Sequence, residues 1–178
     1  MTKLAKYYPY EWMESPFVID YESLYAMGVR GLIFDIDNTL VPHGAPCSTA
    51  VVNLFTRLHQ LGFTTLLLSN NSKTRVEHFN GDLNSYFISD AEKPSLQSVY
   101  KALDMMQISP KQVVLIGDQI FTDICAANEA QIPSILVKYI GHEKCEWKGF
   151  RRYLETLVLL TYKLRKKYQH RLFSIESR

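Results

Sequence analysis

Cysteines are scarce in this sequence, and their arrangement does not suit a disulfide framework or a zinc site. There are three among 178 residues, Cys47, Cys125 and Cys145, and no two of them form a CxxC pair. An odd number of widely spaced cysteines argues against a disulfide-stapled secreted domain. We therefore expect a reducing, cytoplasmic compartment and a fold that depends on packing.

Long apolar runs, repeats and low-complexity segments are also missing. No stretch reaches the roughly 20 apolar residues that a membrane-spanning helix needs, and the first residues lack the apolar core of a signal peptide. The composition is typical of a globular protein. We expect a single domain over residues 1–178, with an aromatic N-terminal arm at 1–28.

Charge is distributed unevenly, although the formal net charge is only +2. Residues 148–178 carry nine Lys and Arg against two Glu, whereas residues 1–147 carry eleven basic and sixteen acidic residues. An anionic partner would suit the basic segment, and a solvated helix surface is the plain alternative.

A basic amphipathic helix is predicted at about 150–172. Its apolar positions recur at helical spacing and its basic positions fall opposite, namely Phe150, Leu154, Leu157, Thr161, Leu164 and Tyr168 against Arg152, Lys163, Lys166 and His170. Such a helix can lie on an anionic membrane surface, and it can equally dock on its own domain with its charges in water. Nucleic acid is disfavoured as a partner, because no nucleic-acid-binding module is recognisable.

Apolar strands alternate with helices along the chain. Five strands are predicted, at about 29–35, 63–68, 86–88, 113–116 and 134–138. Helices are predicted to start near Asp20, Ser48 or Thr49, Ser72, Pro94, and Thr122 or Asp123. Alternation of this kind implies βαβ units and a mainly parallel sheet. The predicted fold class is therefore α/β, a doubly wound sheet of Rossmann type.

The most informative stretch runs from Gly31 to Leu40, where an apolar strand meets two carboxylates. Asp35 and Asp37 are spaced i, i+2, and Thr39 follows. Unpaired carboxylates are costly to bury, so we expect them at the exit of the strand, where α/β sheets bind ligands. There one carboxylate can attack a reacting group while the other handles a proton.

Three more polar clusters follow later strands: Ser69 with Asn70, Lys93, and Asp118 with Asp123. In one parallel sheet all of them would meet Asp35 at the same edge. Carboxylates that converge in this way need a cation, and Mg²⁺ suits carboxylate oxygens combined with phosphate and water. With a lysine and a hydroxyl donor nearby, the set is typical of phosphoryl transfer.

These clusters, in this order, resemble the four motifs of the haloacid dehalogenase (HAD) superfamily. The matching segments are Asp35-Ile-Asp37-Asn-Thr39 (DxDxT), Leu66 to Asn70, Glu92-Lys93-Pro94, and Gly117 to Asp123 (GDxxxTD). Nearly the whole chain resembles the small YqeG-type phosphatases of subfamily IIIA. These are related to the phosphatidylglycerophosphate phosphatases of mitochondria.

The resemblance implies a Mg²⁺-dependent phosphomonoesterase with an aspartyl-phosphate intermediate on Asp35. Asp37 would protonate the leaving oxygen and then activate water. Asp35, the backbone carbonyl of Asp37 and Asp118 would hold Mg²⁺, with Asp123 in support. The alternative for Asp123 is a helix N-cap.

The remaining motif residues are assigned in the same way. Ser69, Asn70 and Lys93 would contact the phosphoryl group, and Thr39 would orient the loop. Each has a plainer alternative: Ser69 and Asn70 suit a turn, and Lys93 a surface ion pair. His43, in the loop after the first motif, is interpreted as an exposed loop residue, with contact to the substrate as the alternative.

The motif spacing leaves no room for a cap domain, because only a loop, helices and strands fit between the first three motifs. An open mouth favours a substrate too large to enclose, or closure by an oligomeric neighbour. One candidate is phosphatidylglycerophosphate at a membrane surface, which the protein would contact peripherally. The alternatives are a soluble, protein or nucleic-acid phosphate, and an interaction protein that binds phosphate with little turnover.

Overall fold

The computed structural model describes residues 4–140 and 149–172, with side chains at 149–152 excepted. One sheet of six strands lies at its centre, and every neighbouring pair is parallel. In spatial order the strands are β1 (Glu11–Met13), β6 (Ser134–Val137), β5 (Val113–Gly117), β2 (Gly31–Phe34), β3 (Thr64–Leu68) and β4 (Tyr86–Ile88). The doubly wound α/β prediction is confirmed.

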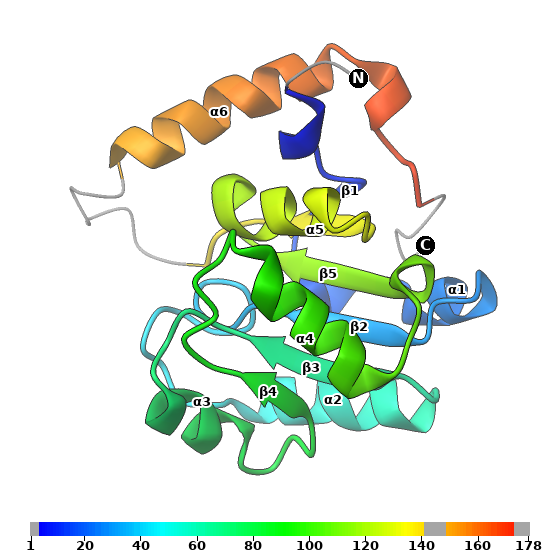
Figure 1. Ribbon diagram of the computed structural model, residues 1–178, viewed down its shortest axis with the longest axis vertical. Helices are drawn as coiled ribbons and strands as arrows, with labels where there is room; N and C mark the ends of the chain where they lie inside the picture. The colour runs from blue at the N-terminus through cyan, green and yellow to red at the C-terminus, as the bar shows by residue number, and fades with distance from the viewer. Residues whose placement is uncertain (1–3, 141–148, 173–178) are drawn as a thin grey trace.

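Helices cover both faces of the sheet (Figure 1). One face packs against α1 (Tyr21–Ala26), α2 (Thr49–Gln60) and α3 (Lys73–Asn80). The other face packs against α4 (Leu96–Met106) and α5 (Cys125–Glu129). Strand residues alternate between the two cores, so that Phe34 contributes to the first and Ile33 to the second.

The predicted starts of α1 and α2 are confirmed. The carboxylate of Asp20 accepts a hydrogen bond from the Ser23 amide, and the Ser48 hydroxyl accepts one from the Val51 amide. Gly28 and Gly62 follow these two helices with φ angles of 94° and 93°, a conformation that favours glycine.

The N-terminal arm contains a strand that the sequence pattern does not predict. β1 pairs with β6 and forms the edge of the sheet, and Tyr8, just before it, is fully buried. The strand has only three residues and no clear alternation of apolar and polar side chains, so it gives no periodic signal.

Two helix boundaries also differ from the prediction. α4 begins at Leu96 rather than Pro94, because residues 92–95 form a turn in which the Ser95 amide donates to the Glu92 carbonyl. The helix after β5 begins earlier, as a π-helical turn, η4 (Ile120–Ile124), that continues into α5. Asp123 therefore lies inside a helical segment and is not its N-cap.

The C-terminal helix is shorter than predicted and is turned differently. α6 (Gly149–Lys163) is followed by a 3₁₀ turn, η6 (Lys166–Tyr168), because the chain folds back onto the arm, where Arg171 donates hydrogen bonds to the Tyr8 and Pro9 carbonyls. Val158 and Tyr162 are buried, whereas Leu157 and Leu164, predicted on the packed face, are exposed. Among the described residues no helix is long and apolar enough to cross a membrane.

Candidate active site

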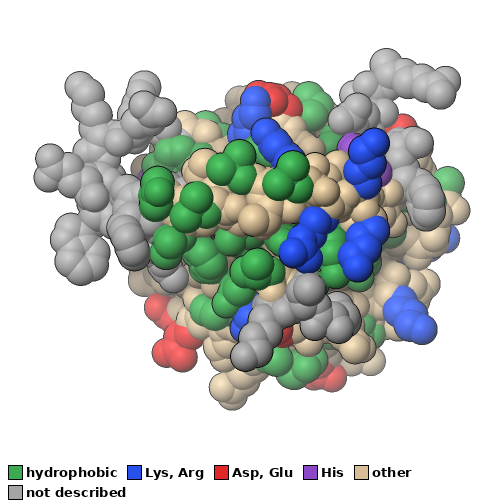
Figure 2. Space-filling view, turned by 90° about the horizontal axis from the view of Figure 1, so that it is seen from above, with side chains coloured by type: hydrophobic (Ala, Val, Ile, Leu, Met, Phe, Trp, Pro, Cys, Tyr) green, Lys and Arg blue, Asp and Glu red, His purple; other side chains and the backbone are tan. Residues whose placement is uncertain are grey.

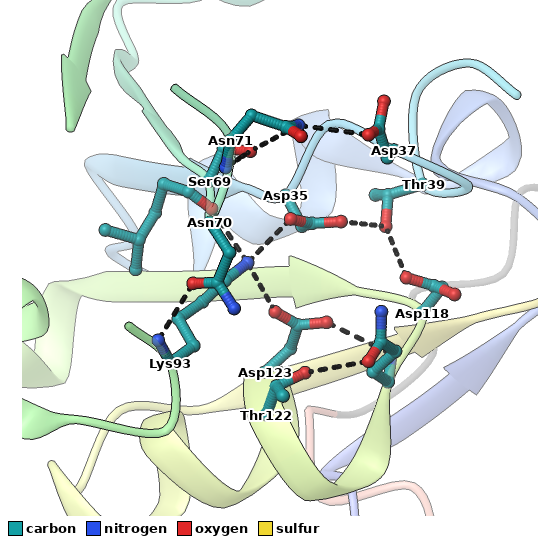
Figure 3. A network of polar contacts seen from close by, with 12 residues as sticks. Asp35, Asp37, Thr39, Ser69, Asn70, Asn71, Lys93, Asp118, Thr122 and Asp123 are labelled. Atoms are coloured by element: carbon teal, nitrogen blue, oxygen red, sulfur yellow. Dashed lines mark hydrogen bonds and ion pairs between the residues drawn. The ribbon is translucent and has the colours of Figure 1, made fainter. Parts of the chain in front are cut away.

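A polar cavity of about 150 Å³ lies where β2, β3 and β5 end. Its walls come from four separate stretches of chain, and the lining residues are Asp35, Asp37, Asn38, His43, Ser69, Asn70, Asn71, Lys93, Gln119 and Thr122. The parallel sheet explains the convergence, because the carboxyl ends of its central strands share one edge. Figure 3 shows Asp35, Lys93 and Asp123 pointing toward one another.

Lys93 stands at the centre of the polar network. Its ammonium group lies 2.6 Å from Asp35 Oδ1 and 2.7 Å from Asp123 Oδ1, and it also donates to the Leu68 carbonyl at 2.8 Å. The Lys93 side chain is only 3% exposed. The surface ion pair considered as its alternative is therefore wrong.

Thr39 connects the first and last motifs. Its hydroxyl lies 3.2 Å from Asp35 Oδ2 and 3.4 Å from Asp118 Oδ1, so it can donate to either carboxylate (Figure 3). The side chain is fully buried, and it lies in the turn that carries the chain out of β2. This placement fits a residue that holds the loop in position.

Three buried carboxylates lie close enough together to share a cation. Asp35, Asp118 and Asp123 each offer one oxygen, and the three oxygens lie within 4.8 Å of one another. Hard oxygen donors of this kind suit Mg²⁺. The Lys93 ammonium contacts Asp35 and Asp123, and carboxylate oxygens this close to one another repel, which a divalent ion between them would offset. The donor set therefore fits the predicted metal.

Asp123 owes its position to the absence of a side chain at Gly117. A Cβ built on Gly117 would lie 2.5 Å from Asp123 Cβ, a distance that atoms in contact do not adopt. The second oxygen of Asp123 accepts a hydrogen bond from the Gln119 amide at 3.1 Å. The glycine of the GDxxxTD pattern thus lets η4 close over the end of β5.

Asp37 points away from the three-carboxylate cluster and has its own set of donors. Asn71 Nδ2 donates to Oδ2 at 3.0 Å, and the Gly44 amide donates to Oδ1 at 3.2 Å. His43 Nδ1 and Arg75 Nη2 lie 2.8 and 3.2 Å from its oxygens. The two motif I aspartates therefore occupy different electrostatic environments.

These environments shift the pKa values of the two carboxyl groups in opposite directions. Burial raises the pKa of Asp35 to about 6, against the opposing effect of the Lys93 ammonium. A divalent cation beside Asp35 would favour the carboxylate and lower that pKa. For Asp37 partial burial is outweighed by hydrogen bonds, first from Asn71, and its pKa lies below the usual range.

Lys93 keeps its proton at neutral pH. Burial disfavours the charged form, but the carboxylates of Asp123 and Asp35 outweigh it and hold the pKa of Lys93 above its ordinary value. The site thus contains a permanent buried cation beside the candidate nucleophile.

Ser69 and Asn70 follow β3 and shape the loop as well as the cavity. The Ser69 hydroxyl accepts hydrogen bonds from the amide and the side chain of Asn71, and Asn70 Oδ1 accepts one from the Lys93 amide at 2.8 Å. Both residues line the cavity. The turn role and a phosphate-contacting role are therefore compatible.

No sequence pattern places Arg75 at the site, yet it contacts Asp37 from α3. The sequence leaves Asn71 between a phosphate contact and turn chemistry, and in the structure it bridges Asp37 and Ser69. His43 was interpreted as an exposed loop residue, and it is 65% exposed yet reaches Asp37. The buried Glu155 of α6 accepts a hydrogen bond from the Ile120 amide at 2.9 Å. Arg75 and Glu155 carry no local pattern, because their partners are remote in sequence.

Comparison with known proteins places the chain in a family. Residues 90–151 match the family model described as HAD-hydrolase-like. The chain is 32% identical over 158 residues to the probable phosphatase YqeG of Bacillus subtilis, covering 88% of this chain and 92% of that protein.

Solved structures share the fold at low sequence identity. The cobalt-bound deoxy-D-mannose-octulosonate 8-phosphate phosphatase of Haemophilus influenzae matches with a TM-score of 0.51 and 13% identity, over 79% of this chain and 92% of that one. An uncharacterised protein from Corynebacterium glutamicum matches with a TM-score of 0.51 and 20% identity, over 85% and 99%. Given the identity to YqeG over most of both chains, the protein belongs to the HAD superfamily and, within it, to the YqeG-type phosphatases.

Proposed function

We propose that the protein is a Mg²⁺-dependent phosphomonoesterase that works through an aspartyl-phosphate on Asp35. The observation that carries the proposal is the placement of Asp35 between Lys93, at 2.6 Å, and the carboxylates of Asp118 and Asp123. A buried carboxylate beside a cation and a cation-binding cluster is equipped to attack an anionic phosphoryl group.

In the first step an oxygen of Asp35 attacks the phosphorus, and the bond between phosphorus and the ester oxygen breaks. The leaving oxygen takes a proton from Asp37, whose side chain lines the same cavity. In the second step Asp37 takes a proton from water, which attacks the phosphorus and releases inorganic phosphate and the Asp35 carboxylate. One residue acts in turn as acid and base.

Charge neutralisation comes from the surroundings of Asp35. Lys93 offsets negative charge on the phosphoryl oxygens, and Ser69 and Asn70 line the cavity as polar contacts for them. Asp35 and Asp118 would hold Mg²⁺ together with the carbonyl of Asp37, supported by Asp123. The bound ion would supply Lewis-acid stabilisation of charge on the transferring group.

The resting contacts of Asp37 favour its base form. Asn71 and Arg75 hold the carboxylate, so the lowered pKa suits activation of water in the second step. For the first step Asp37 must carry a proton. The approach of a negatively charged phosphate would raise its pKa and favour that protonation.

The open site supports a substrate that the protein does not enclose. Between Thr39 and Ser69 the structure has only a loop, α2 and β3, and between Ser69 and Lys93 only α3 and β4. A phosphorylated headgroup such as that of phosphatidylglycerophosphate, presented at an anionic membrane, remains the substrate we favour. A soluble phosphate ester would use the same chemistry.

The decisive experiment compares Asp35→Asn with wild type against an aryl phosphate, with and without Mg²⁺. We expect loss of turnover in Asp35→Asn and in wild type stripped of metal, while circular dichroism shows a folded chain. Asp82→Asn, at an exposed position, serves as the matched control and should retain full activity.

Turnover retained by Asp35→Asn would overturn the assigned nucleophile. Wild type that binds phosphate but turns over none of a panel of phosphorylated metabolites and lipids would instead support a phosphate-binding interaction protein.

A further inference from the structure

α6 presents a stripe of apolar side chains to solvent. Tyr153, Leu157, Leu160 and Leu164 are 61%, 42%, 54% and 84% exposed. They are spaced four, three and four residues apart, which places them on one side of the helix. The last of them, Leu164, directly follows the final residue of α6. We call these four residues the leucine stripe.

The stripe faces outward because the opposite side of α6 is fixed to the body of the protein. Val158 and Tyr162 are buried against Tyr8 and Leu136, and the Tyr8 hydroxyl donates to Thr161 Oγ1 at 3.0 Å. The helix cannot rotate to bury the leucines without losing these contacts. Their exposure is a property of the docked helix.

Basic side chains accompany the leucine stripe. From Tyr153 to Leu172 the chain has five Lys and Arg and a single acidic residue, Glu155, which is buried. Lys163, Lys166 and Lys167 are exposed near the end of the stripe. Figure 2, which faces α6, shows hydrophobic side chains gathered along this surface with Lys and Arg side chains beside them.

We propose that the leucine stripe docks on an anionic lipid surface, with the adjacent lysines contacting the headgroups. An apolar side flanked by basic residues is the pattern of helices that lie in the membrane interface. Each lysine near an anionic bilayer adds a favourable interaction that salt weakens.

A second copy of the chain fits this surface less well. A stable interface needs roughly 20 to 30 residues on each side, and the stripe offers four. Pairing two stripes around a two-fold axis would also bring the exposed lysines of both copies close together, with no exposed acid between Tyr153 and Leu172 to oppose them. Lipid headgroups supply the missing negative charge.

The position of α6 relates the surface to the site. α6 begins on the side of the molecule toward which the strands point, where the cavity lies (Figure 1). Glu155 holds the Ile120 amide, two residues after Asp118. Docking would therefore leave the cavity beside the lipid surface. Only the idea that the lipid is also the substrate rests on the proposed function.

The test is co-sedimentation of the full chain with vesicles of phosphatidylcholine alone and of phosphatidylcholine mixed with phosphatidylglycerol. We expect binding to the mixed vesicles that weakens, without vanishing, as salt is raised. The double variant Leu160→Ser/Leu164→Ser should bind at least about 10-fold more weakly, because two apolar side chains no longer leave water.

The matched control is Met27→Ser/Tyr100→Ser, which removes two exposed apolar side chains elsewhere and should bind as wild type does. Circular dichroism and turnover of an aryl phosphate check that both double variants fold. Asp35→Asn should still bind vesicles, which separates failure of docking from failure of catalysis.

Three outcomes would overturn the proposal. The first is no binding to the mixed vesicles, and the second is equal binding by the stripe variant. The third is a dimer in analytical ultracentrifugation that the stripe variant abolishes, since the stripe would then be occupied by a second copy.

Discussion

Lys93 and Asp123 form an ion pair inside the protein, with 2.7 Å between Nζ and Oδ1 and almost no exposure of either side chain. The same ammonium bonds to Asp35. A lysine held by two carboxylates cannot turn toward solvent, so its charge stays where the phosphoryl group is expected to arrive.

Replacing this lysine should damage both activity and stability. In Lys93→Met we expect kcat/KM to fall by about 100-fold or more, since a preorganised charge at the phosphoryl group is lost. Loss of one partner from a buried ion pair should also lower the free energy of unfolding by about 3 kcal/mol. Lys111→Met, at an exposed position, is the control for both measurements.

The stability defect of Lys93→Met should depend on pH. Burial already raises the pKa of Asp35 to about 6, and removal of the ammonium would raise it further. A carboxyl group whose pKa is higher in the folded than in the unfolded state stabilises the fold at low pH, and that stabilisation is lost as pH rises through the folded pKa. Urea unfolding without Mg²⁺ should therefore show a larger loss of stability in the variant, relative to wild type, at pH 8 than at pH 5. A pH-independent difference would contradict the buried pairing.

Gly117→Ala should disturb the site through Asp123. The added methyl group would meet the Asp123 side chain at 2.5 Å, so η4 must shift. We expect kcat to fall by at least about 10-fold and the Mg²⁺ concentration for half-maximal activity to rise. Gly81→Ala, whose new Cβ would have only an ordinary contact at 3.4 Å, should behave as wild type. Unchanged Mg²⁺ dependence in Gly117→Ala would count against a role for Asp123 near the ion.

Asp37→Asn should make the reaction sensitive to the leaving group. The amide cannot supply a proton, so esters of alkyl alcohols should lose more rate than aryl esters with acidic phenols. Breakdown of the aspartyl-phosphate should also slow, because water lacks its base. Rapid-quench measurements with both ester classes test this. Equal losses for the two classes would argue against Asp37 as the acid.

Glu155→Ala should affect the site although Glu155 lies outside the cavity. The Ile120 amide would lose its acceptor, which costs about 1–3 kcal/mol if the group stays buried. Because Asp118 and Asp123 flank this amide, we also expect the Mg²⁺ requirement to rise. The exposed Glu77→Ala provides the comparison. A variant that is destabilised but keeps the wild-type Mg²⁺ requirement would limit Glu155 to a structural role.

The central sheet could be predicted because β2, β3 and β5 are apolar runs bounded by turn residues. β1 could not, since its three residues are defined by their pairing with β6 and not by a pattern of their own. The orientation of α6 was predicted wrongly for a related reason. Apolar residues occur on more than one side of that helix. The hydrogen bond from the Ile120 amide to the buried Glu155 helps to decide which side packs against the domain.

The motif aspartates and Lys93 could be predicted as neighbours, because each follows a strand of the same parallel sheet. The sequence could not show that the two aspartates of the first motif contact different residues. Asp35 turns inward to Lys93, and Asp37 turns outward to Asn71 and Arg75. That division depends on side-chain directions in loops, which no spacing rule fixes.

The pairing of β1 with β6 has a consequence for biosynthesis. Glu11 is synthesised about 120 residues before its partner Ile135. Until then the β1 segment has no strand to join, and the aromatic residues around it stay uncovered. We expect nascent chains that end before Ile135 to depend on chaperones, and the pairing of β1 with β6 to be a late event in folding.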